Sequence, residues 1–306
     1  MRILVLGAGA VGGYFGGRLA EAGRDVTFLV RPARAALLRE QGLRVISPLG
    51  DFTLRPQLAT AETLAGAYDL IILTAKHYDF DQAIAAIRPA VGPKTAVLPL
   101  LNGLMHLDRL AAAFGDEAIL GGVAYVGASL QPDGGIRHHN RLSGIAFGER
   151  RGGISERAKA IAAEFAGSKV SAPPSGNVML DMWEKFAMIT TMAGMNCLMR
   201  GTIGEIVATE DGTQLMLELF AENQAVAAAS GYKLRPGYID QIAAMLTEKG
   251  SVNNASMHHD LAQGGRTEGE FILGDMRRRA AALGVTTPLL RAAWAHLQVY
   301  ENRLRG

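Results

Sequence analysis

The first half of the chain alternates short apolar runs with segments of helical spacing. Almost wholly apolar runs occur at 2–6, 25–30, 69–75 and 95–100, and such runs bounded by turn residues are typical of buried strands. Helices are expected in the segments between and after them, listed here: 11–22, 33–41, 79–91 and a segment after 102–103. Strands that alternate with helices predict a parallel sheet covered on both faces.

Three further features lie between residues 43 and 170. Residues 43–46 and 51–54 predict a hairpin around Pro48, Leu49 and Gly50, and a second hairpin is expected around 136–147. Additional elements are expected as listed: an extended segment at 118–127, a helix near 155–166 and a strand at Val170.

The pattern changes at Pro173-Pro174-Ser175-Gly176. Beyond this point strand patterns nearly vanish, and helical periodicity runs through the following segments: 177–200, 212–230, 236–248, 269–283 and 288–302. The sequence therefore predicts two domains, an α/β domain with a parallel sheet over 1–172 and an all-α domain over 173–306.

Composition narrows the function classes. Of 306 residues, 49% are hydrophobic, enough for a full core, and the net charge of +2 gives no basic surface for a nucleic acid. Residues 1–23 have neither an unbroken apolar run of about 18 residues nor the order of a signal peptide, so no membrane partner is expected. The single Cys197 excludes an internal disulfide and fits a reducing cytoplasm.

Metal and hydrolase chemistry find no support in the motifs. The neighbouring pairs His138-His139 and His258-His259 cannot place two imidazoles on one helix face, and no second cysteine exists, so no metal site is expected. A Gly-x-Ser-x-Gly motif is also missing from the sequence.

A glycine motif follows the first predicted strand. Gly7-Ala8-Gly9-Ala10-Val11-Gly12 is a G-x-G-x-x-G between a strand and a helix, which is the context that a dinucleotide site requires. Gly7 permits the tight turn, Gly9 lets the backbone approach a pyrophosphate, and Gly12 lets the helix pack on the strand. The helix N-terminus then offers N–H groups and partial positive charge to phosphates. The alternative is a glycine-rich turn without a ligand.

The end of the second predicted strand bears on the choice of cofactor. An NAD site usually places an acidic residue there for the ribose 2′-hydroxyl, whereas this chain has Arg31, with Arg34 one turn later. A guanidinium can pair with a 2′-phosphate, and no carboxylate is expected beside it. We therefore expect NADP(H), with a solvated surface arginine as the alternative.

Distinctive short motifs occur along nearly the whole chain. They are listed here: Gly7 to Gly12, Arg31, Thr74-Ala75-Lys76, Leu101-Asn102-Gly103, Trp183-Glu184-Lys185, Ser256-Met257 with Asp260, and Arg266-Thr267-Glu268. In their order and spacing they resemble the motifs of the ketopantoate reductase (2-dehydropantoate 2-reductase) family. The resemblance implies a Rossmann domain followed by an all-helical domain with the site in the cleft between them, NADPH as the hydride donor and a small 2-oxo acid as the acceptor. Reduction of ketopantoate to pantoate would belong to pantothenate biosynthesis.

The resemblance also implies catalytic roles. Lys185 would be the general acid that protonates the carbonyl oxygen, and Glu268 would contact the cofactor or steer Lys185. Lys76 would face the cofactor and the reacting centre. Simpler interpretations stay open: Lys185 as a helix lysine paired with Glu184 or Asp181, and Glu268 as a helix cap.

Binding roles follow in the same way. Asn102 would hold the nicotinamide ribose and the substrate, Ser256 the substrate carboxylate, and Ala128 would approach the nicotinamide amide. Asn102-Gly103 could instead be only a turn, and Ser256 only a helix N-cap.

The chain departs from the family where asparagines usually hold the substrate. The corresponding positions are Ile189, Ala193 and Ile203, while Asn196 lies near the same helix face as Lys185, with Arg200 beyond it. This predicts a pocket for a substrate more apolar than ketopantoate, with Asn196 as a replacement contact. Two alternatives remain, a related NADP-dependent oxidoreductase of another carbonyl or hydroxy acid and a nucleotide sensor without turnover. The oligomeric state is open, with a homodimer through the helical half as one possibility.

Overall fold

The computed structural model describes residues 1–305, which form two compact units. The first unit comprises Met1–Leu101 and His106–Met179, and the second comprises Asn102–Met105 and the chain from Leu180 onward. The domain boundary expected near residue 173 thus lies shortly before the long helix that opens the second unit.

A five-stranded parallel sheet, in the order β5-β2-β1-β6-β7, forms the centre of the first unit. Leu6 of β1 is in register with Leu29 of β2 and Leu73 of β6, so the three strands end at the same edge. The predicted parallel sheet is confirmed, and β5 is an addition because its three residues are too few for a recognisable pattern. The strands are β1 (Arg2–Leu6), β2 (Asp25–Leu29), β5 (Gln57–Ala59), β6 (Leu70–Leu73) and β7 (Ala96–Pro99).

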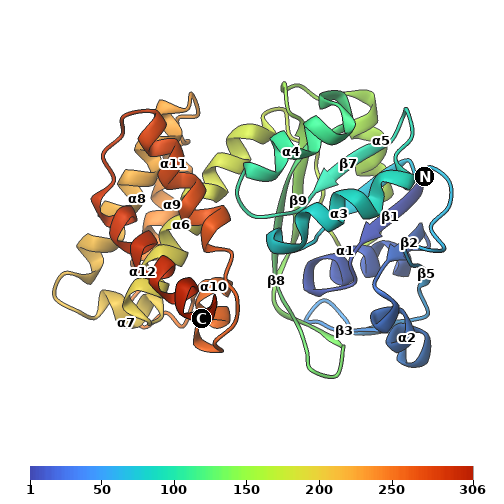
Figure 1. Ribbon diagram of the computed structural model, residues 1–306, viewed down its shortest axis with the longest axis horizontal. Helices are drawn as coiled ribbons and strands as arrows, with labels where there is room; N and C mark the ends of the chain where they lie inside the picture. The colour runs from blue at the N-terminus through green and yellow to red at the C-terminus, as the bar shows by residue number, and fades with distance from the viewer. Residues whose placement is uncertain (306) are drawn as a thin grey trace. The chain divides into compact units, whose positions relative to one another are not determined.

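Helices follow the strands much as predicted (Figure 1). Pro32 begins α2, where its fixed φ suits the first turn, and the Ser155 hydroxyl accepts from Ala158 N at 3.2 Å to cap α5. The helices are α1 (Ala10–Glu21), α2 (Pro32–Gln41), α3 (Phe80–Ile87), α4 (Met105–Phe114) and α5 (Glu156–Glu164), with 3₁₀ turns at His77–Asp79, Arg88–Ala90 and Asp116–Ala118.

A second sheet of the first unit was not expected. It has the order β4-β3-β9-β8, from β3 (Leu43–Ile46), β4 (Phe52–Leu54), β8 (Leu120–Leu130) and β9 (Ile136–Glu149). The β3–β4 hairpin is confirmed, but the hairpin expected within 136–147 is wrong. Those residues form one strand, and the turn lies at Gln131 to Gly135, where Gln131 N donates to Gly135 O at 2.8 Å. Pro132-Asp133-Gly134-Gly135 is the stronger turn signal.

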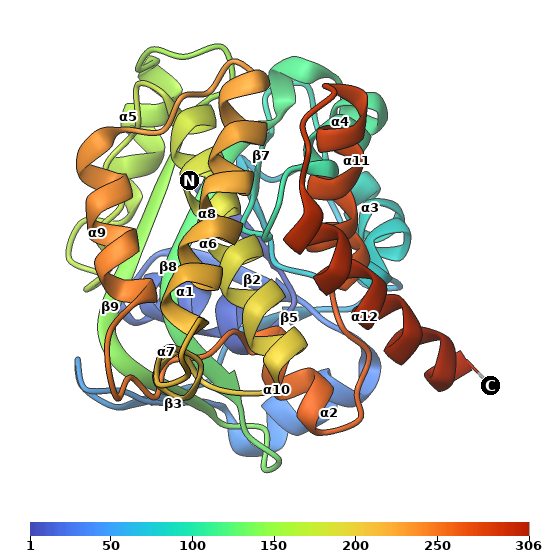
Figure 2. The same ribbon diagram turned by 90° about the vertical axis from the view of Figure 1, so that its left-hand side faces the viewer.

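The regular elements of the second unit, among its described residues, are helices joined by loops (Figure 2). At its centre, α8 contacts α7, α9, α11 and α12. The short helices α7 and α10 and the π-helical segment before α11 were not predicted. The helices are α6 (Val178–Met199), α7 (Ile203–Val207), α8 (Gly212–Ala229), α9 (Pro236–Leu246), α10 (Ser256–Ala262), the π-helical segment Glu270–Gly274, α11 (Asp275–Ala282) and α12 (Pro288–Arg305).

Within residues 1–305, no helix combines the length and apolar character needed to cross a bilayer.

Candidate functional site

The glycine loop between β1 and α1 has the geometry that the motif predicted. Gly7 has φ +94°, a conformation that favours glycine, and its N–H donates to Leu29 O at 3.0 Å. A Cβ added at Gly12 would lie 2.2 Å from Gly7 O and 2.3 Å from Thr74 Oγ1. Gly12 therefore permits α1 to pack directly on the end of β1.

The same loop fits a dinucleotide phosphate. Gly9 is the N-cap of α1 and makes no side-chain cap bond, and the first turn of the helix holds no acidic residue. A Cβ added at Gly9 would meet no atom within 4 Å, so the glycine is not required by packing there. The N–H groups and positive end of α1 can accordingly face an anion.

Arg31 lies beside the loop and is paired with a carboxylate. Its Nη2 is 2.9 Å from Asp79 Oδ2, whereas no carboxylate had been expected next to it. Arg34 has a different task, because it donates to Ala8 O at 2.8 Å and Gly134 O at 2.9 Å. Arg34 thus ties the glycine loop to the β8–β9 turn, whereas the Arg31 side chain is 71% exposed.

Lys76 and Ala128 also lie in the first unit. Thr74 directly follows β6, and its Oγ1 donates to Leu6 O at 2.8 Å, which holds the segment after β6 against the loop. Lys76 is exposed on this segment, two residues after Thr74. Ala128 is partly buried on β8, beside an irregularity in the β8–β9 register between Val126 and Ala128.

Lys185 lies in the middle of α6 and is partly buried. Burial lowers the pKa of the Lys185 ammonium from its ordinary value to about 8, while the charge of Glu268 acts in the opposite direction. Glu268 is itself 7% exposed. The structure therefore brings the predicted general acid and its predicted partner into one electrostatic environment.

Arg235 neutralises the two acidic residues that neighbour Lys185 in the sequence. Glu184 is 1% exposed and accepts from Arg235 N and Nε, both at 2.9 Å, and Asp181 accepts from Nη2 at 2.5 Å. These bonds raise the pKa of the Arg235 guanidinium. They also fix α6 to the start of α9, which holds the helix that carries Lys185.

The turn containing Asn102 belongs to the same unit. Gly103 has φ +77°, and a Cβ added there would lie 2.9 Å from Phe271 O and 3.7 Å from the Phe186 ring. Phe186 follows Lys185, and Phe271 lies three positions after Glu268. The structure thus places the Asn102-Gly103 turn against α6, which carries Lys185, and against the π-helical segment that follows Glu268.

The residues predicted to contact the substrate differ in their exposure and lie on different helices of the second unit. Ser256 is exposed at the first residue of α10, whose N-cap is Ala255. Asn196 is fully buried, donates to Gly201 O at 2.7 Å and accepts from Ala255 N at 3.0 Å. A substrate contact by Asn196 would require these bonds to rearrange. Ala193 and Ile203 are core residues, exposed by 2% and 0%.

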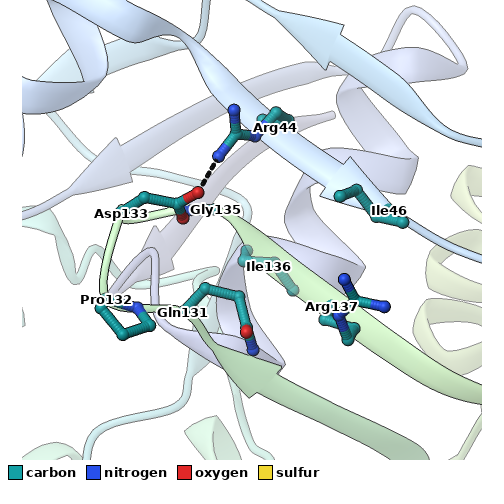
Figure 3. Close-up of a pocket in the computed structure, with 8 residues that line it drawn as sticks. All are labelled: Arg44, Ile46, Gln131, Pro132, Asp133, Gly135, Ile136 and Arg137. Carbon is teal, nitrogen blue, oxygen red and sulfur yellow. Dashed lines mark hydrogen bonds and ion pairs between the residues drawn. The ribbon is translucent and has the colours of Figure 1, made fainter.

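A separate cavity of about 310 Å³ lies between β3 and the β8–β9 turn (Figure 3). It contains none of the predicted site residues. Arg44 pairs with Asp133 across it, and Asp133 Oδ1 accepts from Gly135 N at 2.9 Å. The residues around this cavity therefore fix the β8–β9 turn, to which Arg34 donates through Gly134 O. The described residues include no group of side chains that could hold a metal ion.

Comparison with known proteins places both parts of the chain in one protein family. The family model for ketopantoate reductase PanE/ApbA matches residues 3–152, and the model for its C-terminal domain matches residues 177–301. The uncharacterized oxidoreductase YkpB of Bacillus subtilis is 36% identical over 98% of this chain and 99% of its own length. A 2-dehydropantoate 2-reductase of Streptococcus pyogenes is 30% identical over 95% of both chains.

A solved structure shares the complete fold. The 2-dehydropantoate 2-reductase from Methylococcus capsulatus superposes with a TM-score of 0.89 at 28% identity, over 100% of this chain and 98% of the other. The predicted order of a Rossmann domain followed by a helical domain is thereby confirmed.

Two glycine substitutions separate packing from nucleotide binding. We expect Gly12→Ala to lower the melting temperature and abolish nucleotide binding, because its Cβ would meet Gly7 O at 2.2 Å. Gly9→Ala should melt like the wild type yet bind NADP⁺ at least about tenfold more weakly, since one methyl group would separate the loop from the pyrophosphate. Thermal melting and calorimetric titration measure both quantities. Normal NADP⁺ affinity in Gly9→Ala would contradict the assignment of this loop.

Proposed function

The chain is an oxidoreductase of the ketopantoate reductase family, and on that premise we propose that it reduces a small 2-oxo acid with NADPH. The observation that carries the proposal is Lys185, a partly buried lysine whose pKa is lowered to about 8 and whose protonated form is supported by Glu268. A group with such a pKa can both hold and release a proton near neutral pH. The glycine loop of the first unit supplies the fitting phosphate site.

The proposed chemistry assigns one task to each group. NADPH, when bound, supplies the hydride for the carbonyl carbon. Lys185 Nζ donates a proton to the carbonyl oxygen, on which negative charge develops, and its own positive charge stabilises that oxygen. Glu268 keeps Lys185 protonated before the reaction, because a neighbouring carboxylate favours the charged ammonium.

The remaining residues serve binding in this proposal. The loop from Gly7 to Gly12, including Ala8, Ala10 and Val11, takes the pyrophosphate, and Arg31 takes the 2′-phosphate. Asn102, Lys76 and Ala128 face the nicotinamide half of the cofactor. Ser256, exposed at the start of α10, contacts the substrate carboxylate.

The general acid has a direct test. We expect Lys185→Ala to lower kcat by about a hundredfold or more with nearly unchanged NADPH affinity, because general acid catalysis typically contributes that much. Lys249→Ala, which removes an exposed lysine of the same unit, should retain wild-type kcat. Near-normal turnover in Lys185→Ala would remove this residue from the mechanism.

The wild-type pH profile provides a second readout of the same prediction. The ammonium form of Lys185 predominates below its pKa of about 8, so kcat for reduction should fall as the pH rises through that value. Glu268→Gln removes the charge that raises the pKa and should shift the falling limb to lower pH. An unmoved limb would exclude Glu268 as the residue that steers Lys185.

The cofactor assignment rests on Arg31. We expect NADPH to bind more tightly than NADH and Arg31→Ala to narrow the difference, because a charge-assisted contact is worth about 1.5–3 kcal/mol, or roughly tenfold to a hundredfold. Fluorescence titration with both cofactors measures this difference. Unchanged NADPH affinity in Arg31→Ala would refute the assignment of Arg31.

The substrate prediction rests on the apolar replacements. Ile189, Ala193 and Ile203 offer no hydrogen bonds to a substrate hydroxyl, and both ends of the Asn196 amide are engaged within the unit. A pocket without such partners loses discrimination in favour of the hydroxylated substrate. We therefore expect kcat/KM for 2-oxo acids of similar size without the hydroxyl to equal or exceed that for ketopantoate. A strong preference for ketopantoate would show that other residues replace the missing amides.

A further inference from the structure

Arg31 and Asp79 form an ion pair at the carboxyl end of the parallel sheet, where β1 lies between β2 and β6. In the parallel sheet, β2 and β6 flank β1 on opposite sides, and Leu6, Leu29 and Leu73 end in register. Arg31 follows β2, and Asp79 lies in the 3₁₀ turn that follows β6. Their pairing at 2.9 Å therefore crosses the edge of the sheet at which the glycine loop begins.

The surroundings of this pair leave it accessible to a ligand. The Arg31 side chain is 71% exposed and the Asp79 side chain 34% exposed. Gln82 on α3 accepts a second, longer bond from Arg31 Nη2 at 3.5 Å. An ion pair so exposed contributes little to stability, about 0–1 kcal/mol, so packing does not explain why a carboxylate occupies this position.

We propose that Asp79 is a specificity-determining residue that weakens the preference for NADPH over NADH. The inference rests on the proposed cofactor role of the glycine loop and Arg31. Asp79 competes with the 2′-phosphate for the Arg31 guanidinium and can accept a hydrogen bond from the 2′-hydroxyl of NADH. The site thus holds one group suited to each cofactor, a cation for the phosphate and a carboxylate for the hydroxyl.

The charges determine the direction of the effect. A 2′-phosphate carries up to two negative charges at neutral pH, so it gains from Arg31 and loses from Asp79 beside it. A 2′-hydroxyl has no charge and experiences no comparable repulsion. Arg34 cannot compensate while it donates to Ala8 O and Gly134 O.

The experiment compares NADP⁺ and NAD⁺ binding by calorimetric titration, without turnover. Asp79→Asn removes the charge and nearly retains the shape, and the ratio of Kd for NAD⁺ to Kd for NADP⁺ should rise about three- to tenfold, the size expected for one unit charge a few ångströms away in largely aqueous surroundings. Asp79→Glu keeps the charge and should give a ratio closer to the wild type. Asp81→Asn is the matched control, because Asp81 is 84% exposed and pairs with Arg109 instead.

The outcomes separate this inference from the function on which it rests. A raised ratio in Asp79→Asn, with unchanged ratios in Asp81→Asn, would support Asp79 as a specificity-determining residue. An unchanged or lowered ratio in a folded Asp79→Asn variant, together with normal wild-type NADP⁺ binding, would overturn the inference and leave the proposed function intact. Failure of the wild type to bind either nucleotide would overturn both. Melting temperatures of the variants verify that each is folded.

Discussion

The close approach of α1 to the end of β1 is the constraint on which the nucleotide site depends. The Gly7 carbonyl and the Thr74 hydroxyl occupy the space where a Gly12 side chain would be. Because Thr74 also donates to Leu6 O, the same contact holds the segment after β6 against the loop. Because Gly12 has no Cβ, the N-terminus of α1 can lie against Gly7 and Thr74. Lys76 and Asp79 follow Thr74 on the segment that this contact holds.

A different balance, between burial and charge, governs the helical unit. Desolvation of Lys185 favours the neutral amine, and Glu268 restores part of the proton affinity. The buried carboxylate next to Lys185 in the sequence, Glu184, is bound by Arg235 through its side chain and its backbone. Arg235 thus lets α6 carry acidic residues through an apolar unit without leaving an uncompensated buried charge, which would be strongly destabilising.

Sequence patterns predicted the elements that are long and periodic. The β1–α1 turn and the helices of the second unit were recognisable because hydrophobic spacing and glycine positions are local properties. Local signals failed at Ile136–Glu149, where a single strand replaces the expected hairpin, and at β5 and α7, which are too short to show a period. The second sheet could not be predicted either, since β3 pairs with β9 across about ninety residues of chain and register of that kind depends on tertiary packing.

The candidate site shows the same division between local and tertiary information. Lys185 lies on a helix and the glycine loop lies between a strand and a helix, as expected. Gly103 packs against Phe186, which follows Lys185, and against Phe271, three positions after Glu268. The sequence could not show which of these side chains are already engaged in hydrogen bonds within the protein. Asn196 and Arg34 were candidate ligand contacts by type, yet each is engaged in bonds within its own unit. Asp79 became visible as the partner of Arg31 only because two strands that are separated in the chain flank β1 in the sheet. The chemistry of a site can therefore be inferred from residue types, whereas its selectivity depends on neighbours that only the folded chain brings together.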